Sequence, residues 1–466
     1  MMNVDLGTKA MTYGDSANDK AAFEKITADS IIIGFTGALG SGSTFLAEGL
    51  AKFHSYQCLR LSKIIRSKAA EKGLEPTPST LQDLGDQLRR ENGNHFLVWS
   101  ALWEEEERRR REDLPGRAHL VIDGIRNTKE VDFLRQFPNF YLVSVQAESE
   151  KRRKRMIESG KCKDEDEFNR ADKRDEEERE PYGQKVKKCN YLSDINLINE
   201  EYIAKDDEHR YRQYVNEKLY EKYVAFIEDI AEDKPRLIHL PEDDETLMTM
   251  AYVESKRSKC LKRKVGAVVT TDDEAVLSAG NNSPPDGISC LDHPGYKWCA
   301  RDVLLERMGR AIKRCPECGH EIKTEASCVS CQTVIREYTR RCGCGNDPAI
   351  EYSCPNCGTD IYQKFLPGGN PDTGKMLDMC RSLHAEENAL LALSKAGILA
   401  SQAKKVYTTT FPCNLCANKI VKMGIKEVVY AEPYVTREAM ELLQKDRVNL
   451  RRFEGVKSIA YFRLFS

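Results

Sequence analysis

The sequence predicts an α/β protein with two domains, because it contains two strand-to-helix transitions separated by a cysteine-rich stretch. An apolar run at residues 30–36 leads through a Gly-rich turn into an amphipathic helix, which is typical of the first strand of a parallel sheet. A β-rich run at residues 406–411 is followed by Pro412 and by a helix that we expect to end at Gly424. With 466 residues, the chain is long enough for two to three domains, each with its own core.

The composition argues against several classes of protein. A net charge of −2, with 31% charged residues, gives no basic field that would draw the chain to nucleic acid or to a membrane surface. No apolar run reaches the ~18 residues of a membrane span, and no signal peptide opens the chain. Seventeen cysteines, many in Cys-x-x-Cys pairs, then indicate thiolate metal sites rather than disulfides. We therefore expect a cytoplasmic protein with no membrane partner.

The most specific pattern is a His-x-Glu triplet, His384 to Glu386, which is followed downstream by Pro412-Cys413-x-x-Cys416. In such a pattern one imidazole and two thiolates bind zinc and leave its fourth position to water. We expect His384, Cys413 and Cys416 to be the ligands and Glu386, which is not a ligand, to carry protons during catalysis. The alternative is a structural zinc knuckle at the two cysteines, with His384 serving only as a helix cap.

Residues 246–466 resemble the deoxycytidylate deaminase branch of the cytidine deaminase family. Beyond the two metal motifs, the resemblance rests on residues 258–260 leading into 265–269, on the loop 280–287, and on residues 424–430. It implies a three-layer α/β/α fold and a deoxycytidine nucleotide as the substrate.

The same resemblance implies substrate contacts from Asn282, Ala385 and Tyr434. The loop 280–287 departs from the family's usual pattern at Asn281, where the family has Tyr, and at Ser283, where it has Gly. Those two departures affect the detailed contacts of the loop.

Residues 37–42, which we call the Gly-rich loop, predict a phosphate cradle between a strand and a helix N-terminus. The loop and the next two residues fit G-x-x-x-x-G-K-[ST] except that Ser43 replaces the lysine. Since that lysine stabilises phosphoryl transfer, we expect nucleotide binding without strong catalysis. The expected nucleotide-binding residues are Gly37, Gly40, Ser41, Gly42, Ser43, Thr44 and Asp123.

Residues 30–235 resemble P-loop nucleotide kinases with a parallel sheet, which implies a bound nucleotide with Mg²⁺. A second buried strand ends at Asp123, a basic lid covers 151–155 and 170–179, and a late strand covers 194–199. The alternatives are a turn that binds no phosphate and a solvated helix in place of the lid. Residues 1–29 read as a polar lead-in, and 200–245 as a helical connector.

A cysteine-rich insertion occupies residues 312–360 of the deaminase-like domain. Eight thiolates fill two closed tetrahedral sites, which are structural because no coordination position stays open. Pairing in sequence order and an interleaved pairing both fit the spacing. The expected ligands are Cys315, Cys318, Cys328, Cys331, Cys342, Cys344, Cys354 and Cys357.

Three further cysteines, Cys260, Cys290 and Cys380, match or lie near positions that bind an additional zinc in some deoxycytidylate deaminases. The alternative for these residues is that they are buried free thiols that act as small hydrophobic side chains.

The whole architecture resembles bacterial antiphage deoxycytidylate deaminases. This resemblance implies conversion of dCTP or dCMP to the uracil nucleotide, a regulatory nucleotide or inhibitor at the N-terminal domain, and a homo-oligomer. Two other hypotheses are a nucleic-acid-editing deaminase and a nucleotide kinase with a deaminase-like appendage. The near-neutral charge opposes the first, and Ser43 opposes the second.

Overall fold

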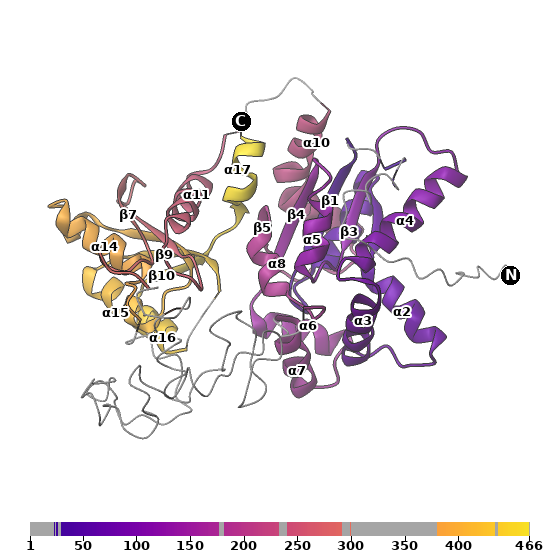
Figure 1. The fold of residues 1–466 in the computed structure, drawn as a ribbon, viewed down its shortest axis with the longest axis horizontal. Coiled ribbons are helices and arrows are strands. Elements are labelled where there is room, and N and C mark those ends of the chain that lie inside the picture. The colour runs from indigo at the N-terminus through magenta and orange to yellow at the C-terminus, as the bar shows by residue number, and fades with distance from the viewer. Residues whose placement is uncertain are drawn as a thin grey trace, which may run out of the picture. The chain divides into compact units, whose positions relative to one another are not determined.

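A computed structural model describes residues 23, 25–26, 29–176, 181–232, 240–290, 299, 380–433 and 437–465 (Figure 1). The chain forms two compact units. The N-terminal unit combines residues 1–249 with 453–466, and the inserted unit comprises residues 250–452. The eight cysteines of the 312–360 insertion, Tyr434 and nearly all of the 1–29 lead-in lie outside the described residues.

The N-terminal unit is built on a six-stranded sheet in the order β11-β5-β4-β1-β3-β2. All neighbouring strands run parallel except β11, which is antiparallel to β5. The parallel sheet predicted after residue 30 is therefore confirmed. The strands are β1 (Ile31–Thr36), β2 (Gln57–Arg60), β3 (His119–Asp123), β4 (Phe140–Gln146), β5 (Ile195–Ile198) and β11 (Gly455–Val456).

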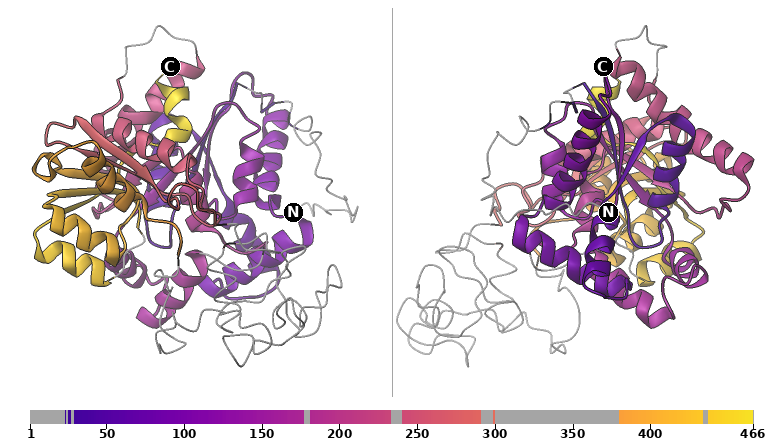
Figure 2. Two further views of the ribbon diagram at one scale, coloured as in Figure 1. Left: turned by 60° about the vertical axis from the view of Figure 1, so that its left-hand side comes forward. Right: turned by 90° about the vertical axis from the view of Figure 1, so that its right-hand side faces the viewer.

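Helices cover both faces of this sheet, as the alternation of side chains along β1 requires. Ile31, Ile33 and Phe35 join one buried cluster, and Ile32 joins a second. The first cluster includes residues of α1 (Ser43–His54), α9 (Glu208–Val215), η2 (Asn216–Val224), α10 (Ala225–Ala231) and α17 (Ser458–Leu464). The second includes residues of α2 (Leu61–Glu71), α4 (Phe96–Arg111), α5 (Thr128–Leu134) and α8 (Val186–Leu192). The two views of Figure 2 show both layers of helices.

Two local predictions for this unit differ from the structure. The segment read as a connector contributes α9, η2 and α10 to the core, because Tyr211, Val215 and Leu219 are buried against the sheet. The charged run at residues 104–111 predicts an exposed helix, since each Glu lies four residues before an Arg, yet Glu106 is fully buried. Its carboxylate accepts hydrogen bonds from the backbone N–H groups of Lys25 and Ile26, which lie far away in sequence.

The last residues of the chain return to the N-terminal unit, whereas the predicted deaminase domain ran to residue 466. Val456 pairs with Ile195, and the Val456 N–H donates to the carboxylate of Glu245 at 2.8 Å. The ammonium of Lys457 is 1% exposed and donates to the carbonyls of Asn190 and Tyr191. The deaminase-like residues are thus inserted between two parts of one unit.

The inserted unit contains a five-stranded sheet in the order β10-β9-β8-β6-β7. Strands β8, β9 and β10 run parallel, while β6 is antiparallel to β7 and β8. The strands are β6 (Gly266–Thr270), β7 (Val276–Asn281), β8 (Lys405–Thr410), β9 (Glu427–Glu432) and β10 (Asn449–Arg452). The accompanying helices are α11 (Asp243–Lys256), whose last seven residues belong to this unit, α14 (Ala385–Lys395), η5 (Ala400–Gln402), α15 (Asn414–Met423) and α16 (Arg437–Lys445).

Two glycines let helices approach opposite faces of this sheet. A Cβ at Gly266 would lie 1.9 Å from the Ala251 carbonyl oxygen in α11. A Cβ at Gly280 would lie 2.4 Å from the Ala389 nitrogen in α14. Gly280 pairs with Ala267, so Gly266 and Gly280 face opposite sides of the sheet. The predicted α/β/α layering is therefore present.

Among the described residues, no helix is both long enough and apolar enough to cross a membrane.

The return of the C-terminal segment gives a first prediction. Replacing Lys457 by Met leaves buried carbonyl groups without a donor, so we expect the free energy of unfolding to fall by about 1–3 kcal/mol. Chemical denaturation measures this loss. The matched control is Lys445→Met on the exposed end of α16, which should change stability by less than about 0.5 kcal/mol. Equal stability of the two variants would contradict a structural role for Lys457.

Candidate functional site

Two helix N-termini in the inserted unit bring together one imidazole and two thiols. His384 is the N-cap residue of α14, Cys413 is the N-cap residue of α15, and Cys416 lies in the first turn of α15. The His384 Nδ1 atom lies 3.2 Å from Cys413 Sγ and 3.3 Å from Cys416 Sγ. All three ligand atoms lie within 4.8 Å of one another.

This geometry fits a tetrahedral zinc ion. Zinc bonds of about 2.0–2.3 Å place neighbouring ligand atoms about 3.5 Å apart. The observed separations are close to that value, so His384, Cys413 and Cys416 would hold zinc with only a small adjustment of their side chains.

The protonation state of the thiols also suits a metal. Hydrogen bonds from Cys416 and from His384 lower the pKa of Cys413 to about 4, which makes it a thiolate at neutral pH. The same hydrogen bond to Cys413, together with burial, raises the pKa of Cys416. The pair therefore shares one proton, and a cation bound between them would replace that proton.

Glu386 lies beside the ligands without joining them. Its side chain is 4% exposed, and the Thr408 hydroxyl donates to its Oε1 atom at 3.3 Å. Burial raises the pKa of Glu386, because it disfavours the charged form of the carboxyl group. A raised pKa in a buried carboxyl group is what general acid–base catalysis requires.

The loop after β7 is fastened next to His384. The Leu383 N–H donates to the Ser283 carbonyl at 3.1 Å, and the Asn388 side chain donates to the Asn281 carbonyl at 2.7 Å. Asn388 lies four residues after His384, so both lie on the same side of the helix start. These contacts place the loop at the edge of the metal site.

Asn282 and Ala385, which the resemblance gives as substrate contacts, have structural partners. The side-chain Oδ1 of Asn282 accepts from the Ser258 hydroxyl and the Val265 N–H, and its Nδ2 donates to the Arg263 carbonyl. Ala385 is fully buried at the start of α14. Substrate contact by these two residues remains a prediction, and Tyr434 lies outside the described residues.

Sequence reasoning missed two residues of this site, Thr408 and Asn388. Asn388 had a usable signal, because a polar residue four positions after a helical ligand lies on the same face. Thr408 had none, since it is one of three consecutive threonines in a β-rich run. Only the pairing of β8 with its neighbours selects it.

The additional zinc predicted at Cys260, Cys290 and Cys380 has no complete site in the described part of the chain. There, the group formed by His384, Cys413 and Cys416 is the sole set of three metal-binding atoms within 4.8 Å. Cys290 is buried and its sulfur lies 3.3 Å from the Ser382 hydroxyl.

The Gly-rich loop of the N-terminal unit adopts the backbone conformation that a phosphate cradle requires. Gly40 and Gly42 have φ values of 79° and 92°, which favour glycine. The Thr44 hydroxyl donates to Asp123 Oδ2 at 2.7 Å, because parallel pairing of β1 with β3 brings Asp123 beside the loop. Burial raises the pKa of Asp123.

Two buried atoms at this loop have no hydrogen-bond partner within the described structure. They are Ser41 Oγ and Asp123 Oδ1, which belong to residues only 1% and 4% exposed. Buried polar atoms normally have partners, so a bound ligand with its own donors and acceptors fits here. Phosphate oxygens and a hydrated Mg²⁺ ion have that chemistry.

A cavity of about 620 Å³ opens around the loop. Residues of the loop, Thr44 and Asp123 line it, together with a large number of cationic side chains. These cations are Arg60, Arg66, Arg89, Arg126, Arg155, Lys161, Lys163 and Lys205. Such a lining suits a phosphorylated ligand.

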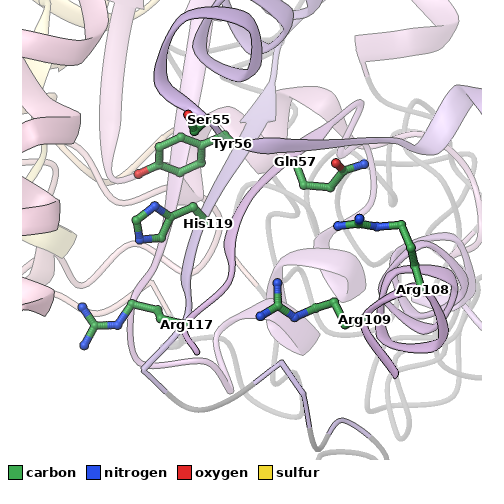
Figure 3. A pocket seen from close by; sticks show the side chains of 7 residues that line it. All are labelled: Ser55, Tyr56, Gln57, Arg108, Arg109, Arg117 and His119. Atoms are coloured by element: carbon green, nitrogen blue, oxygen red, sulfur yellow. The ribbon is translucent and has the colours of Figure 1, made fainter. Parts of the chain in front are cut away.

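A smaller cavity of about 310 Å³ lies where β2 and β3 begin, at the opposite ends of the strands from the loop. Figure 3 shows Arg108 and Arg109 projecting from α4 toward the strands that carry Gln57 and His119. Arg108 pairs with two glutamates, and Arg109 donates to the Lys25 and Gly116 carbonyls. Carboxylates pair with Arg108 and backbone carbonyls accept from Arg109, so neither guanidinium indicates a ligand in this cavity.

Comparisons with known proteins agree with the inserted unit. The family model of the cytidine and deoxycytidylate deaminase zinc-binding region matches residues 241–432. The deoxycytidylate deaminase of Schizosaccharomyces pombe is 28% identical over 214 residues, which are 46% of this chain and 44% of that protein. The deoxycytidylate deaminase of Enterobacteria phage T4 is 27% identical over 190 residues, 41% of this chain and 77% of that protein. The chain thus spans less than half of the fission-yeast relative.

Another relative belongs to a different group. A UPF0200 protein of Methanothrix thermoacetophila is 31% identical over 134 residues, which are 28% of this chain and 68% of that protein. The chain belongs with the UPF0200 proteins, and its residues 241–432 match the cytidine and deoxycytidylate deaminase zinc-binding region.

Proposed function

We propose that this chain hydrolytically deaminates deoxycytidine nucleotides, converting dCMP or dCTP to the uracil nucleotide and ammonia. The observation that carries the proposal is the cluster of His384, Cys413 and Cys416 with the buried, non-ligating Glu386 beside it. The two relatives named deoxycytidylate deaminase support the choice of a deoxycytidine nucleotide. The loop 280–287 supports it too, because it is fastened at the edge of the metal site.

In the proposed reaction, Glu386 moves the protons. A zinc ion held by His384, Cys413 and Cys416 supplies an acidified water molecule when it is bound. Glu386 takes a proton from the attacking water and gives it to the ring nitrogen next to the amino-bearing carbon. It then transfers the second proton of that water to the departing amine, which leaves as ammonia. Water and cytosine are consumed, and uracil and ammonia are formed.

The burial of Glu386 suits this shuttle. A carboxyl group in water has a pKa near 4 and is a weak acid catalyst at neutral pH. Burial raises the pKa of Glu386, and the Thr408 hydroxyl orients one carboxylate oxygen. The residue can therefore act as base and then as acid in one turnover.

The N-terminal unit has, in this proposal, a regulatory role as a nucleotide-binding domain. The Gly-rich loop, Thr44 and Asp123 supply a cradle and a place for Mg²⁺. Ser43 removes the lysine that promotes phosphoryl transfer, which favours a sensor over a kinase. The proposed ligand is a nucleotide or an inhibitor, and the proposed assembly is a homo-oligomer.

The biological role that we propose is antiviral. Consumption of deoxycytidine nucleotides would starve phage replication in a bacterial cell. The resemblance of the whole architecture to bacterial antiphage deoxycytidylate deaminases supports this role.

The proposed substrates can be tested by measuring the release of ammonia. Purified protein should release ammonia from dCMP, from dCTP or from both, and it should act much more slowly on CMP. Following ammonia and the uracil nucleotide over time measures this. A cytidine-containing single-stranded oligonucleotide is the comparison substrate. Deamination of the oligonucleotide without turnover of either deoxynucleotide would overturn the proposal.

The different roles proposed for Glu386, which transfers protons, and for the zinc ligands give another prediction. Glu386→Gln should lower kcat by about 10²–10⁴-fold, because it removes the proton carrier, while the zinc content stays equal to that of the wild type. Cys416→Ser should lose about one zinc per chain together with activity. Elemental analysis and ammonia release measure both effects. Loss of zinc in Glu386→Gln would mean that Glu386 is a ligand.

The antiviral proposal has its own test. Bacteria that express the wild-type chain should show lower dCTP and dCMP pools after phage infection, and lower phage yield, than bacteria that express Glu386→Gln. Mass spectrometry of nucleotides and plaque counts measure the two quantities. Equal yields with unequal pools would separate the enzyme activity from any defence role.

A further inference from the structure

The Gly-rich loop lacks its usual cation but keeps the rest of a phosphate site. Ser43 has no charge to offer a β- or γ-phosphate, whereas Thr44 and Asp123 are bonded together as a Mg²⁺ site needs. The Ser41 Oγ and Asp123 Oδ1 atoms are buried and have no hydrogen-bond partner within the described structure. Both residues line the 620 Å³ cavity. These features favour an anionic ligand. A cation that binds this ligand in place of the missing lysine must come from another part of the cavity wall.

Helix α6 (Ser149–Glu158) packs directly on the loop. Arg152 donates to the Leu39 carbonyl at 3.0 Å, and a Cβ at Gly40 would lie 2.7 Å from the Arg152 carbonyl oxygen. Arg155 donates to the carbonyls of Gly40 and Ser41. Since these contacts use loop carbonyl groups, the two arginines support the loop without occupying its N–H groups.

The turn after α6 places Lys161 in the wall of the same cavity. Its backbone N–H donates to the Met156 carbonyl at 3.0 Å, which fixes the turn to the helix. Its ammonium has no hydrogen bond or ion pair to another described residue. By contrast, Lys154 on α6 pairs with Glu158 and lies outside the cavity lining.

Lys161 belongs to a group that we call the cation cluster, which consists of Arg60, Arg66, Lys161 and Lys205 and lines the cavity. Glu48 is paired with Arg60 and with Lys205, so one carboxylate serves two cations. Arg60 lies opposite Asp123 in the β2–β3 register. The cluster therefore lies on the side of the cavity where Thr44 and Asp123 would hold Mg²⁺.

The electrostatics of the cluster point to a missing anion. Partial burial lowers the pKa of Lys161, and repulsion from Lys205, Arg60 and Arg66 lowers it further. Like charges gathered around a cavity are unfavourable unless a ligand neutralises them. A polyphosphate with its Mg²⁺ would neutralise these positive charges. It would also provide partners for the unpartnered Ser41 Oγ and Asp123 Oδ1 atoms.

We propose that Lys161 takes the place of the lysine that Ser43 removes, so that the loop binds the polyphosphate of a nucleoside triphosphate. This inference rests on the nucleotide-binding part of the proposed function and does not depend on deamination. The terminal phosphates lie between the loop and the cation cluster, where Lys161 contacts them.

The test is nucleotide binding by the full chain. Isothermal titration with the Mg²⁺ complexes of ATP, GTP, dATP, dGTP and dTTP, and with the corresponding monophosphates, avoids every deaminase substrate. Lys161→Ala should weaken binding of the preferred triphosphate by about tenfold or more, because one charge-assisted contact is lost. Binding of the matching monophosphate should change by less than about twofold. Lys154→Ala, on the helix α6 that precedes this turn, is the matched control and should bind both ligands as the wild type does.

A rescue variant separates a phosphate contact from a general structural effect. Adding Ser43→Lys to Lys161→Ala should restore triphosphate affinity, since it returns a cation to the phosphate cradle at position 43. Unchanged triphosphate affinity in Lys161→Ala, equal loss for monophosphate and triphosphate, or failure of the rescue would each overturn the inference. If the wild type binds none of these nucleotides, the regulatory nucleotide site is overturned as well, while ammonia release still decides the deaminase proposal.

Discussion

The candidate active site depends on one packing constraint, the close approach of α14 to the sheet of the inserted unit. Gly280 allows this approach, because any Cβ there would collide with the backbone of α14 at Ala389. The N-terminus of α14 then presents His384 at a distance of 3.2–3.3 Å from the two thiols of α15. Zinc sites need ligand positions that are accurate to a few tenths of an ångström, so an enlarged residue at 280 would act on the metal through the helix.

The sequence was most informative where the structure is local. The helix expected after Pro412 is α15, and it ends at Gly424 with a φ of 75°, as its composition indicates. The proposed metal ligands and Glu386 could be selected from the sequence because each belongs to a short motif whose spacing is set by a helix start. Asp123 was predictable in a similar way, as the acidic end of a buried strand, and its bond to Thr44 follows from parallel pairing.

Contacts between distant segments were not predictable from the sequence. The pairing of Val456 with Ile195 joins residues more than 250 positions apart, and neither segment contains a sequence pattern that predicts this pairing. Glu106 was read as exposed because its neighbours are charged, yet its carboxylate binds two backbone N–H groups from the start of the described chain. Thr408 was not selected among three threonines, since only the register of β8 places it near Glu386. In each case a partner from elsewhere in the chain decides the role of a residue.

Hydrogen bonds within the N-terminal unit link the Gly-rich loop to both chain connections of the inserted unit. The Asn199 side chain donates to the Ser41 carbonyl at 2.8 Å, and Asn199 directly follows β5. Strand β11, which pairs with β5, is separated from β10 of the inserted unit by only two residues. At the other connection, the Val456 N–H is bonded to Glu245 in α11, the helix that leads into the inserted unit. In the proposed regulation, a ligand that alters the loop at Ser41 would act on β5, whose partner β11 follows one chain connection and is hydrogen-bonded to the helix of the other. The change would then reach the inserted unit through the covalent chain.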